Sequence, residues 1–125
     1  MGDRANIYLV DTNSERCGIY LYTHWDGTEW PERLCKALIV ARPVWNDPEY
    51  CARIIVREVF SDYDGLKGGG ISTRLGDNEH PIIVCDLPLQ IVAYAHEGQE
   101  RDGETWYGAL TFADYVAQET ARYPS

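Results

Sequence analysis

Basic residues are scarce in this chain. It carries 11 lysines and arginines against 20 aspartates and glutamates, which leaves a formal net charge of −9 at pH 7. Nonspecific binding to nucleic acid depends on cationic side chains that replace the counterions of the phosphate backbone. We therefore expect no nucleic-acid partner. The acidic excess can serve solubility alone, or it can meet a basic protein, including as a mimic of nucleic acid.

Long apolar runs are also missing. The longest ones, such as Ala37–Ala41 and Pro81–Cys85, are far shorter than the roughly 20 residues of a membrane-spanning helix. The segment Met1–Asn6 lacks the apolar core of a signal peptide. We expect no membrane contact and a cytosolic location.

Cysteines are few and scattered. Cys17, Cys35, Cys51 and Cys85 form no Cys-x-x-Cys pair, and each lies in an apolar stretch. This pattern is typical of reduced, buried thiols rather than of a disulfide framework or a zinc site.

The material for a folded core is present. A chain of 125 residues with 45% hydrophobic side chains has the usual size of one domain, so we predict a single domain over residues 1–125. Apolar segments bounded by turn residues predict strands. The predicted strands are Ile7–Val10, Gly18–Tyr22, Ile71–Leu75, Ile82–Asp86 and Leu89–Tyr94.

Three segments have helical signals. The first runs from Pro31 to the stop at Pro43, the second begins at Asn46–Glu49 and ends near Phe60, and the third opens on the capping pattern of Thr111–Asp114. The resulting order, ββααβββα, does not alternate strictly. It predicts an α+β domain with a mainly antiparallel sheet and helices packed on it.

Two stretches between these elements look like loops. Asp62–Gly70 is rich in glycine and turn residues, and Gly98–Gly103 is dominated by charged and polar residues. We expect the first to be an internal loop rather than a domain linker, and the second to be exposed to solvent.

The chain contains no complete catalytic or cofactor motif. Ser72 lacks a Gly-x-Ser-x-Gly frame, and Gly68–Gly70 is not followed by the Gly-Lys-Ser or Gly-Lys-Thr end of a phosphate loop. The candidate metal ligands have no recognised ligand spacing: His24, His80, His96, Asp26, Asp77 and Glu79. We expect no metal and no cofactor.

Two polar loops, Tyr22–Gly27 and Gly70–Pro81, stand out because each adjoins a predicted strand. Functional residues are often found on loops that a rigid scaffold positions. In one hypothesis the protein is a small hydrolase or transferase, in which His24 is the general base and Asp26 or Asp86 orients it. Arg74 would stabilise an anionic group, and Ser72 would supply a hydroxyl. Turn chemistry and loop anchoring also explain the same residues, and we favour this structural interpretation of both loops.

The leading hypothesis is a non-enzymatic protein that binds another protein. Its motivation is the acidic composition, the abundance of aromatic residues and the lack of a complete catalytic motif. A third hypothesis is a small-molecule-binding module without catalysis, with a pocket lined by aromatic side chains. The candidate binding residues are Trp25, Trp30, Asp77, Asn78, Glu79 and His80, beside His24 and Asp26.

The stretches Tyr20–Gly27 and Gly70–Asp86, together with Trp45–Pro48, resemble a group of small uncharacterised bacterial and phage proteins. The resemblance covers about residues 17 to 95. It implies a mobile-element setting, in which the protein would modulate a host system. Because no activity is known for that group, the resemblance implies no catalytic residue.

Overall fold

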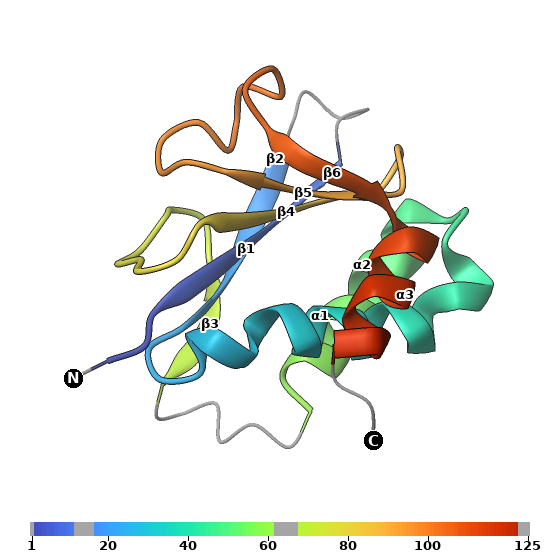
Figure 1. The fold of residues 1–125 in the computed structure, drawn as a ribbon, viewed down its shortest axis with the longest axis horizontal. Helices are drawn as coiled ribbons and strands as arrows, with labels where there is room; N and C mark the ends of the chain where they lie inside the picture. The colour runs from blue at the N-terminus through green and yellow to red at the C-terminus, as the bar shows by residue number, and fades with distance from the viewer. Residues whose placement is uncertain (1, 12–16, 62–67, 123–125) are drawn as a thin grey trace.

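The computed structural model describes residues 2–11, 17–61 and 68–122. Within them the chain forms an α+β domain built on one six-stranded sheet (Figure 1), which confirms the predicted fold class. The elements are β1 (Ala5–Asp11), β2 (Cys17–Thr23), the 3-10 turn η1 (Gly27–Glu29), α1 (Trp30–Ala41), the 3-10 turn η2 (Arg42–Val44), α2 (Pro48–Val59), β3 (Gly69–Ser72), β4 (Ile82–Asp86), β5 (Ile91–Ala95), β6 (Tyr107–Thr111) and α3 (Phe112–Arg122).

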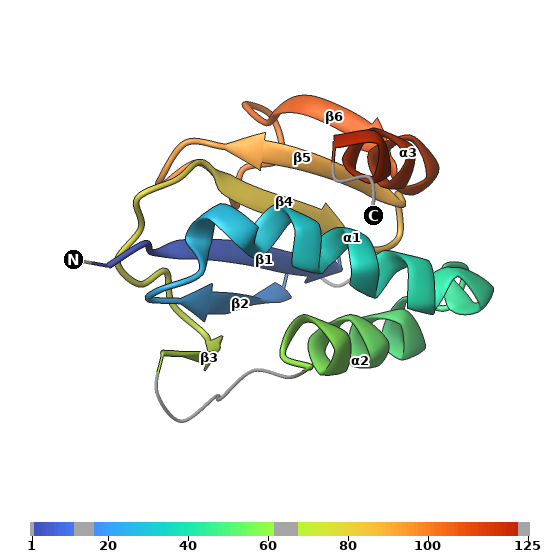
Figure 2. The same cartoon turned by 60° about the horizontal axis from the view of Figure 1, so that its bottom comes forward.

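The strands lie in the order β3-β2-β1-β4-β5-β6 (Figure 2). β1 and β4 are parallel neighbours, whereas the other four pairs are antiparallel. The sheet is therefore mainly antiparallel, as predicted. β3 and β6 are its two edges.

The three helices cover one face of the sheet, with α1 between α2 and α3 (Figure 2). Their apolar sides share one buried cluster with alternate residues of the strands, such as Ile7, Leu21 and Ile83. The predicted helix starts are confirmed. The Asp47 side chain accepts a hydrogen bond from the Tyr50 backbone N–H, at 3.2 Å, and a capping contact of this kind satisfies an N–H group that has no partner within the helix.

The opposite face of the sheet is covered by loops. Its buried residues form a second cluster that includes Tyr8, Tyr20 and Val84, and Leu75 and Trp106 from two loops pack against it. We refer to the segment 73–81 as the first loop and to the segment 96–106 as the second loop.

Three details of the chain differ from the sequence-based expectation. β6 was not predicted, because Gly108 and Ala109 are weak strand formers. In the structure, Gly108 has a φ of +64° and lies beside a register shift between β5 and β6. Gly69 and Gly70 belong to a strand rather than to a loop, and residues 62–67 of that predicted loop lie outside the described residues. The expectation that Gly98–Gly103 is exposed is wrong for Glu100, which is 4% exposed.

The described thiols are buried and free, as expected, at Cys35, Cys51 and Cys85. Burial raises the pKa of all three and brings that of Cys51 to about 11. The side chain of Cys17 lies outside the description. In the described part of the chain, no helix has both the length and the apolar character needed to span a membrane.

Candidate functional site

The two polar loops meet at one end of the sheet, beside residues 3 and 4. Gly27 donates its N–H to the Asp3 carbonyl at 2.7 Å, and Glu79 donates its N–H to the Arg4 carbonyl at 2.9 Å. A Cβ atom at Gly27 would lie 2.7 Å from the Asp3 carbonyl oxygen and 2.8 Å from His80 Cδ2. Glycine is therefore required where these segments approach each other.

Asp3 is the centre of a small polar network that joins both loops. One carboxylate oxygen lies 2.5 Å from His80 Nε2, and the other accepts from the Thr28 N–H at 2.8 Å and from the Thr28 hydroxyl at 2.7 Å. The bond to His80, followed by those to Thr28, lowers the pKa of Asp3 to about 2. His80 was predicted to be a binding residue, and the structure shows it holding the first loop in place.

Two further predicted binding residues also make contacts within the fold. Asn78 accepts a hydrogen bond from Asn6 Nδ2 at 3.1 Å and donates one to the His80 carbonyl. Glu79 accepts one from the Arg4 N–H at 3.1 Å. These side chains fix the path of the first loop over the sheet, so their polar groups are already engaged in the free protein.

A cleft lies between the ends of β2 and β3 and the first loop. We call it the β2–β3 cleft. Its volume is about 320 Å³, and it is lined by Tyr22, His24, Ile71, Ser72, Gly76 and Asp77. The two polar loops predicted from the sequence, Tyr22–Gly27 and Gly70–Pro81, thus converge. They bring His24, Ser72 and Asp77 into one hollow. The ring of His24 lies edge-on to that of Tyr22, with 5.5 Å between the centroids.

The polar groups of the β2–β3 cleft are not assembled into a catalytic relay. Ser72 Oγ accepts a hydrogen bond from the Arg74 N–H at 3.0 Å. Asp77 makes a loose ion pair with Arg4 at 3.9 Å, and its side chain is 76% exposed. Among the described residues, no side-chain hydrogen bond joins His24 to Ser72 or to Asp77. The cleft therefore offers polar groups to a ligand without an oriented general base.

Two large apolar side chains of these loops contact solvent: Ile71 lines the cleft, and Trp25 follows the cleft residue His24 in the chain. Trp25 is 56% exposed and Ile71 is 53% exposed. Trp25 lies two residues after the end of β2, and the Thr23 hydroxyl accepts hydrogen bonds from the N–H groups of Trp25 and Asp26, at 3.3 Å and 3.1 Å. Asp26 thereby occupies a fixed turn before η1, and its carbonyl accepts from the Glu29 N–H.

Two predicted site residues are elsewhere in the molecule. Trp30 is fully buried, and its indole N–H donates to the Leu21 carbonyl at 2.9 Å, so it is a core residue and not a contact residue. Asp86 is also buried. Asp86 lies beside Val10 of β1, whereas Thr23, next to His24, lies opposite Ala5. Ala5 and Val10 are five residues apart along β1, a distance of about 16 Å. Asp86 therefore cannot orient His24.

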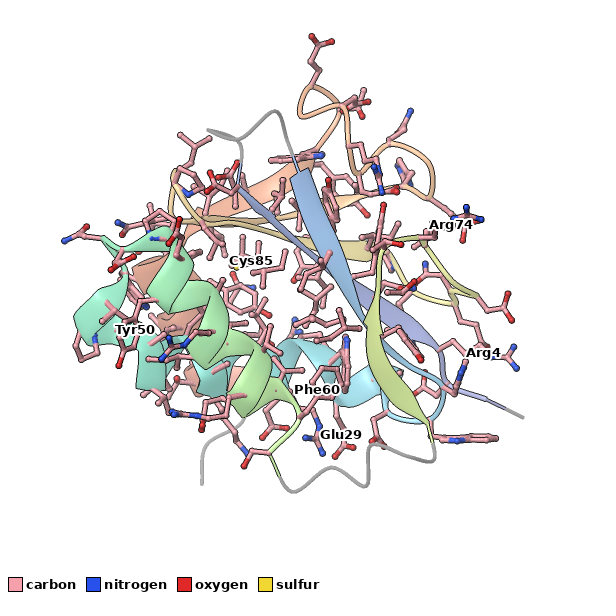
Figure 3. The ribbon with its side chains drawn as sticks, turned by 180° about the vertical axis from the view of Figure 1, so that it is seen from behind. Arg4, Glu29, Tyr50, Phe60, Arg74 and Cys85 are labelled. Atoms are coloured by element: carbon pink, nitrogen blue, oxygen red, sulfur yellow. The ribbon has the colours of Figure 1, made fainter. Side chains whose placement is uncertain are left out.

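Asp86 has a different role, since its carboxylate accepts a hydrogen bond from the Leu89 N–H at 3.2 Å in the β4–β5 turn. Arg74 does not line the β2–β3 cleft. Figure 3 shows the side chains of Arg74 and Arg4 on the same side of the molecule. Arg74 is thus an exposed cation in the first loop, and its backbone rather than its guanidinium contacts Ser72.

Sequence analysis missed the buried polar cluster that ties the second loop to the sheet. The Glu100 carboxylate accepts hydrogen bonds from the Tyr20 hydroxyl at 2.7 Å and from the Gly98 N–H at 2.9 Å. Arg101 donates to the same Tyr20 hydroxyl at 3.0 Å, and its guanidinium lies over the rings of Tyr8 and Tyr20. Burial, and then the bond to Glu100, raise the pKa of Tyr20 to about 12. A charged loop sequence has no signal for such burial, because the partners are about 80 residues away.

The acidic residues are unevenly distributed. Residues 27–60 and 112–122, which contain the helices, carry seven acidic and six basic side chains, whereas the remainder carries 13 acidic and five basic ones. An open groove of about 840 Å³ between the first and second loops is lined by Arg4, Asp77, Glu79 and Glu97, among others. Of the described residues outside 27–60 and 112–122, ten are acidic and three are basic, and Asp77 is the acidic residue among them that lines the β2–β3 cleft.

Within residues 2–11, 17–61 and 68–122, no group of three or more histidine, cysteine, aspartate or glutamate side chains is arranged to hold a metal ion. Comparison of the chain with models of protein families, with curated proteins and with solved structures finds no match.

Proposed function

We propose that this chain is a binding protein that contacts another protein through the β2–β3 cleft and the exposed side chains of Trp25 and Ile71. The observation that carries the proposal is the convergence of two distant loops on one hollow, which the exposed side chain of Ile71 lines and which contains His24, the neighbour in sequence of the exposed Trp25. Tryptophan is seldom left exposed, and aromatic anchors often dominate the energy of binding at protein interfaces. In the mobile-element setting that the sequence resemblance implies, the partner would be a host protein.

The structure supports the contact surface in a second way. Asp3, Asn78 and His80 hold the first loop through internal hydrogen bonds, so the cleft is formed before any partner arrives. A preorganised surface loses less conformational entropy on binding than a loop that must be ordered.

The experiment is affinity capture with Trp25→Ala and a matched control, Leu89→Ala. Leu89 is 62% exposed in the β4–β5 turn, at the other end of the sheet from Trp25. We expect Trp25→Ala to lose a partner that wild type and Leu89→Ala both recover, with all three proteins equally stable to heat. Recovery of the same proteins by both variants would refute the surface assignment.

The shared position of His24, Ser72 and Asp77 in the cleft favours one alternative, a small hydrolase or transferase. Its test is a screen of ester, amide and phosphoester substrates with wild type and His24→Ala. Turnover that His24→Ala abolishes would establish this alternative, whereas equal background rates for both proteins would reject it.

A further inference from the structure

The outer edge of β3 is an unpaired side of the sheet within the described part of the chain. β3 is the end strand of the sheet, and β2 is its neighbour (Figure 2). An edge strand presents backbone N–H and C=O groups that another extended chain can use.

The register identifies which backbone groups face β2. Opposite residues of an antiparallel pair alternate between hydrogen-bonded and non-hydrogen-bonded positions. His24 donates its N–H to the Gly68 carbonyl at 2.6 Å, which marks a hydrogen-bonded position just before β3. Counting in steps of two, Gly70 and Ser72 are the residues of β3 that bond to β2.

The residues between them face outward. The N–H and C=O groups of Gly69 and Ile71 therefore point away from β2, and they are the groups that a further strand would meet. The glycine at position 69 also leaves the approach to this edge free of a side chain, because it has no Cβ.

The other edge of the sheet is less suited to pairing. β6 has a register shift against β5 and a glycine with a φ of +64° at Gly108, and it leads directly into α3. Bulges of this kind twist an edge strand away from regular pairing. β3 follows β2 without a register shift, so it keeps regular strand geometry.

The two faces beside the β3 edge differ in chemistry. Ile71 lies opposite Leu21, on the face of the sheet that carries the helices. Trp25 lies two residues beyond the end of β2, whose last residue, Thr23, is opposite Gly69. On the other face, Ser72 lines the β2–β3 cleft with His24 and Asp77, and Ile71 also lines this cleft. A strand added here would place alternate side chains against an apolar face and against a polar cleft.

Charge selects the chemistry of the added strand. Asp77 presents a largely exposed carboxylate at the cleft, and the described residues outside 27–60 and 112–122 carry ten acidic and three basic side chains. A second copy of this chain would bring another −9 of net charge to the same edge, and like charges oppose such pairing. A segment that alternates basic and apolar residues is complementary to both faces.

We infer that β3 binds an extended segment of a basic partner protein as an added strand, with its apolar side chains on Ile71 and Trp25 and its basic side chains toward Asp77. This inference rests on the proposed function and names its binding mode. Main-chain hydrogen bonds to Gly69 and Ile71 provide register, and the alternating side chains provide specificity.

The test uses a blocked peptide of alternating lysine and valine, about eight residues long, the length of an ordinary strand. It is titrated into the ¹⁵N-labelled full chain. We expect shifts of the Gly69 and Ile71 amides together with those of the β2–β3 cleft. Ile71→Pro removes an outward N–H and leaves the bonds to β2 intact, so it should weaken binding about tenfold or more. Ile71→Ala keeps the N–H and should weaken binding only a few-fold.

Two controls separate pairing from charge. A peptide methylated on every internal backbone nitrogen keeps its charge but has no N–H group to donate from either edge, so it should bind wild type about tenfold more weakly; this test does not depend on the folding of any variant. Asp77→Asn should weaken binding about two- to threefold, as expected for an exposed charge pair. Glu104→Gln removes the same charge from the second loop and should leave binding unchanged.

Equal affinity of the peptide for wild type and for Ile71→Pro would overturn the inference. Equal affinity of wild type for the methylated and the unmethylated peptide would also overturn it. Shifts confined to the cleft would reject strand addition and leave the proposed contact surface standing. The lack of any shift at millimolar peptide would also reject strand addition. Concentration-dependent dimers with a protected Ile71 amide would assign the edge to a second copy instead. The proposed function fails separately, when Trp25→Ala and Leu89→Ala recover the same proteins.

Discussion

Replacing Asp3 by asparagine removes the charge at the centre of the network that joins the two polar loops. Asparagine has nearly the same shape, but it cannot supply a carboxylate to His80 and Thr28. The pKa of Asp3 falls from an ordinary value of 3.8 to about 2 in the folded protein, which corresponds to at most about 2.4 kcal/mol of stabilisation at neutral pH. About a third of the Asp3 side chain and of the His80 side chain is exposed. Screening by solvent therefore reduces the stabilisation to about 1 kcal/mol.

The pH dependence follows from the direction of the change in pKa. A carboxylate with a lowered pKa stabilises the fold fully above the ordinary value of 3.8, and this stabilisation disappears as the pH falls toward about 2. We expect wild type to exceed Asp3→Asn in free energy of unfolding by about 1 kcal/mol at pH 6. We expect the difference to vanish near pH 2.

The assay is urea unfolding of both proteins between pH 2 and pH 7, followed by tryptophan fluorescence. Asp77→Asn is the matched control, because its carboxylate makes only a loose and exposed ion pair with Arg4; its effect should stay within about 0.5 kcal/mol at every pH. A difference between wild type and Asp3→Asn that persists unchanged at pH 2 would show that shape, and not charge, holds the loops together.

Three further outcomes test the core. Trp30→Ala should lower the free energy of unfolding by about 3 to 5 kcal/mol, because it empties a fully buried site; a loss below about 1 kcal/mol would place this indole outside the core. Tyr20→Phe should lower the free energy of unfolding by about 1 to 3 kcal/mol, because the buried Glu100 carboxylate loses a hydrogen-bond donor. Denaturant unfolding measures this loss, with Tyr22→Phe as the control. Equal losses in the two variants would contradict the role of the Tyr20 hydroxyl. In a Cys17→Ser background, the three described thiols should react with a disulfide reagent at pH 8 only after unfolding, because burial raises their pKa; rapid reaction of the native protein would contradict this burial.

The local parts of the fold were predictable because their signals are local. Asp47 and Thr111 cap helices at the positions that their sequence neighbours indicate, and the segment Ile82–Asp86 forms the predicted strand. The fold class followed from the order of such elements. β6 escaped prediction because its pairing with β5 overrides the weak strand propensity of Gly108 and Ala109.

The candidate site was predictable in place but not in the roles of its residues. Convergence of the two loops brings His24, Ser72 and Asp77 together, while Trp30 and Asp86 are buried elsewhere. Spacing along the chain cannot distinguish Trp30, which anchors the core, from Trp25, which faces solvent, since both lie next to the same turn, η1. The side chain of His80 is used by Asp3, which is 77 residues away in sequence, and no local pattern encodes that contact.

The parallel pairing of β1 with β4 at the centre of the sheet has a consequence for the order of folding. Ile7 lies beside Ile83, whereas the β1–β2 and β4–β5 pairs join segments close in sequence. Contacts of large sequence separation require closure of a long loop and form slowly. The two antiparallel hairpins can therefore form early, and we predict that the joining of β1 to β4 limits the folding rate. Until that step is complete, the central strands of the sheet expose unpaired edges, and the nascent chain is most prone to aggregation during this interval.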